Sequence, residues 1–542
     1  MSDTAPRTGL TRAVGSMAMG TAVSRMTGVL RVLVLAYVLG ISPLADAFNL
    51  ANTIPNMLFD IVLGGVLGAT FIPVFIERLA SRTEREAWRS ISAVVTISVV
   101  VLGVATVIFL IAAPWLIDAF TMFDHARLSH SAVQLERQRQ VATTLLRWFV
   151  PQIFLYGVLS IGGALLNVRR VFGAPMWVPI ANNVVCIAVL GIFAMVAPTP
   201  TLSSVAASPG QLALLGAGTT LGVAVQAFLL IPSLRKAELG RLRWRFDLKD
   251  DAVKTIARLG SWTFGFVVMN QLSLFVVIAL AFSVGGGGPV SAYTYAYAFM
   301  QMPYAVVAVS VMSAVTPDLA HQHASEDPVA FTARFGSGLR AVLAMIVPAA
   351  VVMFLLARPL IALLLGHGNA HAAQTLQTGT ALAELSLGLV GFTVFQFVVR
   401  AMQTMHHAKA VFWLYVVENI INVVLAVILV GPLGLAGVAL SVSIAYSIGA
   451  VGGLLLLHHW LGRLGTPGCY QPLGRVLIAS GVMGAVILVV SNLSGAESGP
   501  ALLGRVVGSI IAGALAYLAV ISLLGRHQAG RRSSLQDSEP TP

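Results

Sequence analysis

Apolar residues follow one another in long uninterrupted runs along this chain, instead of alternating with polar residues as they do in transmembrane β-strands. A run of about 20 residues is the length that an α-helix needs to cross the hydrocarbon core of a bilayer. The pattern therefore predicts an all-α polytopic membrane protein with about fourteen transmembrane helices. The predicted helices cover residues 14–40, 46–76, 91–118, 141–166, 176–197, 211–233, 256–284, 290–317, 336–365, 377–403, 410–430, 433–459, 472–492 and 501–525.

Composition supports this prediction and narrows the choice of partners. Hydrophobic residues make up 57% of the chain and charged residues 10%, whereas soluble domains carry about 25% charged residues. The basic residues behind the formal net charge of +12 cluster in short connections between apolar runs, so we expect membrane lipids and no nucleic acid as partners. The two cysteines, Cys186 and Cys469, lack the spacing of metal ligands, and we expect neither a disulfide nor a metal site.

The basic residues also predict the orientation of the chain in the membrane. They follow the even-numbered spans, as Arg82 follows the second and Arg243 the sixth, while most of the opposite connections contain neither lysine nor arginine. The positive-inside rule then places both termini in the cytoplasm. Because Arg25 and Arg31 interrupt the first apolar run, we expect it to remain as a transmembrane helix and not to be cleaved as a signal peptide.

Similar stretches in the two halves of the chain predict an internal repeat. Residues 109–117, at the outer end of the third span, resemble residues 354–362 at the outer end of the ninth. An even number of intervening spans implies a parallel repeat, with two six-helix lobes related by a pseudo-two-fold axis around a central cavity. The predicted domains are an N-lobe (1–240), a C-lobe (241–465), two extra helices (466–527) and a disordered cytoplasmic tail (528–542).

Two arginines, Arg25 and Arg31, lie within the first predicted span. Arginine stays protonated in proteins, and placing it at bilayer depth costs about 3 kcal/mol or more, so the pair predicts a wet or protein-lined cavity that holds an anion. The two residues are about 9 Å apart along an ideal helix and differ by about 120° in direction. An extended anion such as a diphosphate therefore fits them, above all if Gly28 loosens the helix. Reaching the interface or pairing with a carboxylate is the alternative.

Acidic and amide side chains also fall in predicted spans. Asp46, at the outer end of the first hairpin, could form an ion pair of an outer gate or cap the second helix. Asp60 lies deeper, and an arginine partner is the simplest way to satisfy it, as part of the same substrate site. Glu418, Asn419 and Asn422 bring together oxygens that could hold Na⁺ or a proton, although hydrogen bonds between buried helices are an alternative.

The sequence shows no pattern typical of an enzyme site: no glycine-rich phosphate loop between a strand and a helix, no zinc-ligand spacing and no paired carboxylates on one helix face. The run Gly285–Gly288 predicts a flexible turn. We therefore expect a transporter without enzymatic activity or a cofactor, driven by an ion gradient, the membrane potential or the gradient of its own substrate.

Motifs of the first hairpin resemble a known family. They are Ser24-Arg25-x-x-Gly28-x-x-Arg31, Ala45–Phe48, Ile54–Asn56 and Phe71–Pro73. They resemble the start of the MviN/MurJ proteins, which are flippases for the lipid-linked peptidoglycan precursor lipid II within the multidrug/oligosaccharidyl-lipid/polysaccharide exporter superfamily. The similarity continues through Pro179–Asn182 to Gly434–Leu440 and covers nearly all of the predicted spans.

The resemblance implies a fourteen-helix fold with a cationic central cavity in a bacterial cytoplasmic membrane. It also implies that Arg25 and Arg31 engage the lipid II diphosphate, that Asp46 is a functional acid, and that alternating access carries the lipid to the outer leaflet. Proteins of cell-envelope synthesis are then possible partners. Where many members carry basic residues in the second span, this chain has Phe59 and Asp60.

A second departure lies in the eighth span, where the family has an Asp-Arg pair and a Glu and this chain has Tyr297, Ala298 and Gln301. These departures make the predicted cavity less cationic. They leave open an exporter of another polyprenyl-linked glycan or a cation or multidrug antiporter, although an antiporter predicts an acidic, aromatic-lined cavity. A non-transporting scaffold for cell-envelope assembly is the third hypothesis.

Overall fold

The structure is a computed structural model that describes residues 7–61, 71–124, 131–237, 239–462 and 470–536. Every regular element within these residues is a helix. Eleven of the described helices are long and apolar enough to cross a membrane, and a twelfth span results if the bent pair α16 and α17 is counted as one. The all-α membrane fold predicted from the apolar runs is therefore confirmed.

The longest helix contains two of the predicted spans. Helix α18 (Ala408–Leu461) has 54 residues, which is about 81 Å at 1.5 Å per residue and far exceeds a hydrocarbon core of about 30 Å. Gly434 interrupts it with a φ of 57° and a ψ of −133°, a backbone conformation that is essentially restricted to glycine. The break separates the predicted spans 410–430 and 433–459.

Two other predicted spans differ from single continuous helices in the described residues. The ninth, 336–365, is divided, because α14 (Pro328–Leu355) ends before α15 (Ala357–Leu365) begins. The middle of the second, 46–76, lies outside the described residues, with α2 and α3 on either side of it. Neither finding changes the fold class.

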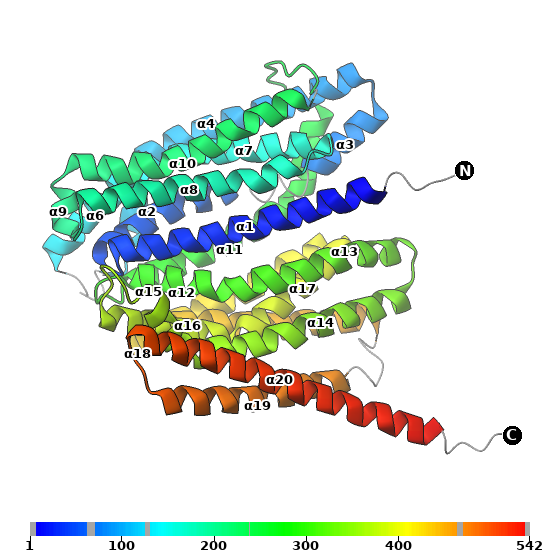
Figure 1. The fold of residues 1–542 in the computed structure, drawn as a ribbon. Helices are drawn as coiled ribbons and strands as arrows, with labels where there is room; N and C mark the ends of the chain where they lie inside the picture. Colours follow the sequence, from blue (N-terminus) through cyan, green and yellow to red (C-terminus); the bar gives the residue numbers. More distant parts are fainter. Residues whose placement is uncertain (1–6, 62–70, 125–130, 238, 463–469, 537–542) are drawn as a thin grey trace. The chain divides into compact units, whose positions relative to one another are not determined.

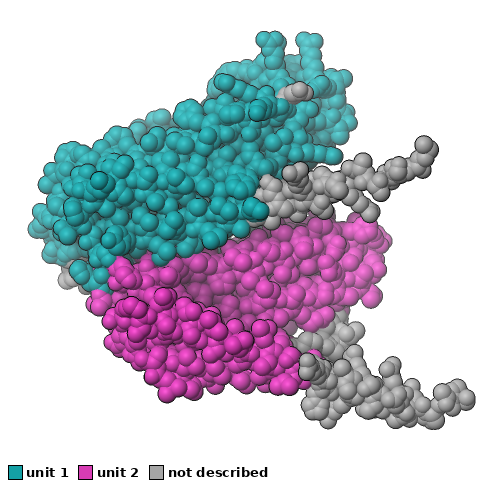
Figure 2. All heavy atoms as spheres, in the orientation of Figure 1, with its two compact units in different colours: residues 1–291, 368–371 teal, residues 292–367, 372–542 magenta. Residues whose placement is uncertain are grey.

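The chain divides into two compact units, coloured separately in Figure 2: residues 1–291 with 368–371, and residues 292–367 with 372–542. Figure 1 labels the helices of each unit. Unit 1 contains α1 (Arg7–Leu39), α2 (Pro43–Phe59), α3 (Ile72–Ser81), α4 (Glu84–Phe120), α6 (Ala132–Phe149), α7 (Pro151–Val168), α8 (Gly173–Val196), α9 (Leu202–Ala206), α10 (Pro209–Lys236) and α11 (Asp251–Phe282).

Small residues let the helices of unit 1 approach one another closely. A Cβ at Gly222 of α10 would collide with Asn182 of α8, and one at Gly157 of α7 would collide with Leu102 of α4. Such contacts are typical of membrane helices, where packing replaces the hydrophobic effect as the driving force. Near the start of α2, Phe48 packs edge-on against Phe149 of α6 with ring centroids 5.4 Å apart.

Unit 2 begins within α12 (Pro289–Pro303), whose first turn groups with unit 1. It continues with the π-helical turn η3 (Tyr304–Ala308), α13 (Val309–Ala324), α14, α15, α16 (Ala372–Leu387), α17 (Leu389–Thr404), α18, α19 (Tyr470–Ser494) and α20 (Gly499–Gln536). Its core includes an aromatic cluster in which the ring of Tyr446 lies 4.9 Å from that of Phe392 and 5.4 Å from that of Phe395.

The compact units do not end where the repeat places the lobes. Packing groups α11 and residues 241–291 with unit 1, because α11 contacts α4, whereas the repeat assigns them to a C-lobe from residue 241. The lobe boundaries remain a prediction. Helix α20 also continues to Gln536, where a disordered tail from residue 528 was expected. Extending an existing helix avoids the cost of nucleation, which explains how polar residues can continue it.

Candidate functional site

Helix α1 carries the two arginines, and contacts with α8 fix its rotation. The Nδ2 atom of Asn183 donates to the Ser24 carbonyl oxygen at 3.2 Å and to the Thr27 hydroxyl at 3.0 Å. Arg31 follows these residues on the same side of α1 and is half-buried within electrostatic reach of Tyr156 and Cys186. The α8-facing side of α1 therefore contains Arg31.

Arg25 lies on another side of α1. Its side chain is exposed within unit 1, as is that of the neighbouring Met26. The difference in direction expected from helical geometry is therefore present, and α1 is one continuous helix through Gly28. Among the described residues, no carboxylate lies within ion-pair distance of either Arg25 or Arg31. No described carboxylate thus neutralises either guanidinium, so each could bind an anion.

Asp46 lies in the first turn of α2 and is 1% exposed. Its Oδ1 accepts a hydrogen bond from the Ser291 amide at 2.7 Å and its Oδ2 one from the Val290 amide at 3.4 Å. These amides belong to the first turn of α12, so Asp46 supplies the acceptor that an N-cap residue usually provides. Ser42 caps α2 instead, which makes the expectation that Asp46 caps its own helix wrong.

The turn between α1 and α2 is enclosed by two further contacts that the sequence did not predict. Gly288 has a φ of +128°, and a Cβ there would collide with the backbone of Ile41 and Ser42, so the glycine run is a site of close packing and not only a flexible turn. Asn369 donates its side-chain amide to the Val38 carbonyl at 2.7 Å and its backbone amide to the Tyr37 carbonyl at 3.1 Å. Gly368, which precedes Asn369, is the residue from which a turn at this position could have been predicted.

Asp60 follows the last residue of α2 and accepts a hydrogen bond from the Nε2 atom of Gln271 in α11 at 3.1 Å. The arginine partner expected from the sequence is therefore replaced by a neutral amide. Asp60 lines a cavity of about 390 Å³ within unit 1, together with Ser160, Asn167 and Gln226. The structure does not bring Asp60 into contact with Arg25 or Arg31, so the four residues predicted as a substrate site remain separate within unit 1.

Glu418 lies in the core of unit 2. It is 0% exposed, and neither carboxylate oxygen has a hydrogen-bond partner among the described residues. Tyr297, Tyr415 and Tyr446 lie within electrostatic reach of it. A buried carboxylate without partners is costly as an anion, so the residue must be neutralised by a proton or by a cation.

The two asparagines predicted to join Glu418 have different surroundings. Asn422 accepts a hydrogen bond from the Ser441 hydroxyl at 3.0 Å, whereas Asn419 donates to the Tyr415 carbonyl of its own helix at 2.8 Å. Asn422 lies one turn from Glu418 on the same side of α18. The sequence did not indicate Ser441, which follows Gly434 and is brought back by the break in α18.

Comparison with known proteins now places these features in a family. Residues 35–503 match the sequence profile described as "Lipid II flippase MurJ". The chain belongs to this family. Lipid II flippase MurJ of Burkholderia cenocepacia is 27% identical over 492 residues, which are 88% of this chain and 89% of that protein. Probable lipid II flippase MurJ of Vibrio cholerae is 25% identical over 524 residues, which are 93% and 94% of the two chains.

Solved structures agree on the fold. A lipid II flippase MurJ in an inward closed conformation superposes with a TM-score of 0.75 at 21% identity, covering 95% of this chain and 99% of that one. An inward-facing MATE family multidrug resistance transporter of the MOP superfamily gives a TM-score of 0.65 at 16% identity, covering 82% and 98%. As a member of the MurJ family, the chain is a membrane transporter and not an enzyme.

Proposed function

We propose that this chain moves lipid II, or a closely similar polyprenyl-diphosphate glycolipid, from the cytoplasmic to the outer leaflet of a bacterial cytoplasmic membrane. Membership of the MurJ family supports the substrate. The observation that carries the proposal is the pair of arginines on α1, for which the described part of the chain offers no carboxylate within ion-pair distance. Planar guanidinium groups suit phosphate oxygens. The basic connections support an orientation with both termini in the cytoplasm.

In this proposal Arg25 and Arg31 bind the diphosphate, and the lipid tail stays in the membrane. A charged hydrogen bond contributes about 1.5–3 kcal/mol, so removing one arginine should weaken substrate binding by about 10–150-fold. Asp46 contributes by holding the first turn of α12 beside α1 and α2. Asp60, bonded to Gln271, would shape the unit 1 cavity without binding phosphate directly, because two anions repel.

The test is complementation of a strain depleted of its own lipid II flippase, combined with the accessibility of labelled lipid II to a membrane-impermeant reagent. We expect Arg25→Gln and Arg31→Gln to abolish growth and outward movement at normal protein levels, and Arg→Lys variants to restore part of it. Arg85→Gln, which removes an exposed charge from the first turn of α4, is the matched control and should grow normally. Normal growth of both α1 variants would refute the site.

We further propose that Glu418 with Asn422 binds the coupling ion, a proton or Na⁺. The support is complete burial of a carboxylate whose oxygens have no hydrogen-bond partner among the described residues. Glu418→Gln keeps the shape of the protonated acid and should fold, yet transport should no longer respond to the ion gradient. Asn419→Ala is the control, because that amide is bonded within its own helix. Unchanged ion dependence in Glu418→Gln would show that the carboxyl serves packing alone.

A further inference from the structure

The connection between α10 and α11 contains a strict alternation of apolar and charged residues. Its apolar positions are Leu242, Trp244, Phe246 and Leu248, and its charged positions are Arg241, Arg243, Arg245, Asp247 and Lys249. Residues 241–247 belong to neither a helix nor a turn and lead into a turn at 248–249. The hydrogen bonds of Arg243 and Arg245 to α4 have the spacing of an extended chain. Because successive side chains of an extended chain point to opposite sides, this 241–249 segment has one apolar edge and one charged edge.

Hydrogen bonds to α4 hold the 241–249 segment in a defined register. The Arg243 amide donates to the Ser92 hydroxyl at 3.2 Å, and the Arg245 amide donates to the Thr96 hydroxyl at 3.0 Å. Residues four apart on a helix are about 6 Å apart along its axis, and residues two apart in an extended chain are about 6.6 Å apart. The two spacings match, so the segment lies along α4 as a strand would lie along a neighbour.

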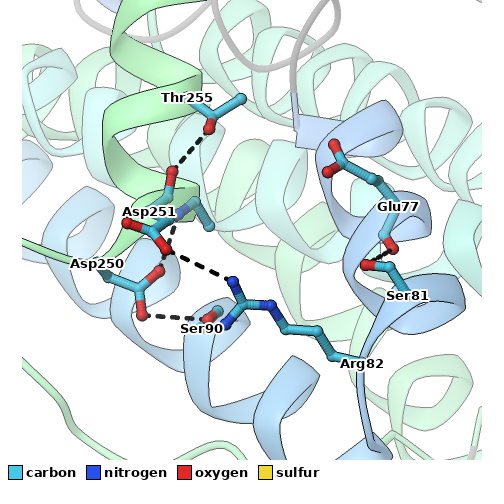
Figure 3. A network of polar contacts seen from close by, with 8 residues as sticks. Glu77, Ser81, Arg82, Ser90, Asp250, Asp251 and Thr255 are labelled. Atoms are coloured by element: carbon cyan, nitrogen blue, oxygen red, sulfur yellow. Dashed lines mark hydrogen bonds and ion pairs between the residues drawn. The ribbon is translucent and has the colours of Figure 1, made fainter.

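Both ends of the 241–249 segment are also fixed. Gly240 lies so close to Trp88 that a Cβ would collide with the indole ring. At the other end Asp250 caps α11 and accepts a hydrogen bond from the Ser90 hydroxyl at 3.1 Å, as Figure 3 shows. In the same view Arg82 pairs with Asp251 at 3.5 Å. The segment is therefore attached to α4 along its length.

The apolar edge of this fixed segment is not packed against unit 1. Trp244 is 72% exposed and Phe246 61%, with Leu248 at 59% and Leu242 at 44%. Four apolar side chains held outward by a bound backbone form a surface that needs a partner. The opposite edge carries three arginines, one lysine and one acidic residue, Asp247, and is therefore net positive. A partner for this surface must combine an apolar region with negative charge.

The position of the 241–249 segment along α4 indicates how deep this apolar surface would lie in the membrane. Helix α4 has 37 residues and is about 55 Å long, which exceeds a hydrocarbon core of about 30 Å. Four of its five charged residues lie between Glu84 and Arg89. About 20 apolar residues toward Phe120 are enough to cross the core, which would leave the stretch with Ser92 and Thr96 near the level of the head groups. Tryptophan and arginine are the residues typical of that level.

We propose that the 241–249 segment is an interfacial binding site for anionic phospholipids of the leaflet that faces it, the cytoplasmic one in the proposed orientation. Arg241 and Arg243 bind head-group phosphates, while Trp244 and Phe246 insert between the head groups and the acyl chains. Arg245 is paired with Asp247 within the segment. This site uses neither Arg25 nor Arg31 and does not depend on transport of lipid II.

The test uses the full chain in nanodiscs of phosphatidylethanolamine with increasing phosphatidylglycerol. Bound phosphatidylglycerol is counted by mass spectrometry, and amide hydrogen exchange is followed in residues 239–250. We expect exchange to slow as phosphatidylglycerol is added. The double variant Arg241→Gln/Arg243→Gln should lower the apparent affinity by about fivefold for each arginine removed.

Two further variants distinguish a built site from general attraction by positive charge. Arg85→Gln/Arg89→Gln removes the same charge from α4 outside the segment and should change the affinity less. Trp244→Ser/Phe246→Ser removes no charge and should nevertheless weaken binding. The proposal is overturned if the two arginine double variants behave alike, or if the aromatic variant binds phosphatidylglycerol as the wild type does.

Discussion

Replacing Asp46 offers a measurable test of how the first turn of α12 is held against α2. Asp46→Ala removes the acceptor of two buried amides in the first turn of α12, at 2.7 Å and 3.4 Å. The first is a strong charge-assisted hydrogen bond and the second a weak one. Val290 and Ser291 are both 0% exposed, so the two amides are shielded from bulk water.

The loss of stability follows from these contacts. A hydrogen bond to a charged group contributes about 1.5–3 kcal/mol, and a buried donor left without a partner costs about 1–3 kcal/mol. The two contributions describe partly the same loss and are not simply added. We therefore expect Asp46→Ala to lower the free energy of unfolding by about 2–4 kcal/mol. Asp46→Asn keeps an oxygen for the Ser291 amide and loses the charge near the helix N-terminus, about 1 kcal/mol. It also loses the weak acceptor of the Val290 amide at 3.4 Å, because the side-chain NH2 cannot accept a hydrogen bond.

The assay combines unfolding in mixed detergent with amide hydrogen exchange at Val290 and Ser291. Asn49→Ala is the matched control, since it removes a neutral hydrogen bond of 2.9 Å to the Ser291 hydroxyl and should cost only about 0.5–1.5 kcal/mol. The reasoning is refuted if Asp46→Ala is no less stable than this control and its two amides exchange as in the wild type. If Asp46→Asn folds well but fails to transport, the charge itself serves function.

Three other predictions follow from named contacts. Asn183→Leu removes two hydrogen bonds to α1 and should lower the free energy of unfolding by about 1–3 kcal/mol, measured in detergent. In Gly28→Ala the new Cβ meets only an ordinary contact of 3.7 Å with Asn183 and should stabilise α1 by about 1 kcal/mol. Slower lipid II movement by this variant in the flipping assay would show that α1 must bend at this position. Arg245 donates a hydrogen bond to Asp247 and lowers the pKa of that carboxyl. The contact therefore stabilises the fold at neutral pH, and this stabilisation is lost as the pH falls through the lowered pKa. Asp247→Asn should remove that part of the acid dependence in unfolding scans.

Local patterns in the sequence were sufficient for the membrane helices and insufficient for their partners. An apolar run specifies a span wherever it occurs, because the bilayer sets the length. The charges on α1 were recognisable for the same reason, since any arginine within such a run requires an explanation. Both inferences need only the residues of one helix.

Contacts between residues far apart in the sequence could not be predicted from these local patterns. Asp46 and Ser291 are 245 residues apart, and nothing near either one indicates the other. Asp60 illustrates the same limit, because an amide on α11 satisfies it where charge alone suggested an arginine. The break at Gly434 could be placed from the sequence, yet its effect of bringing Ser441 back to Asn422 depends on the three-dimensional path of the chain.

The orientation of the two arginines has a consequence for the transport cycle. In a continuous α1 the guanidiniums of Arg25 and Arg31 point in different directions, so one phosphate group meets one arginine at a time. In the proposed site, a diphosphate that contacts both arginines binds more tightly to a state in which α1 is bent between them. A ligand shifts a conformational equilibrium only through such a difference in affinity. The second arginine contact, at about 1.5–3 kcal/mol, would shift the equilibrium by about 10–150-fold, which is enough to couple substrate binding to a change in access.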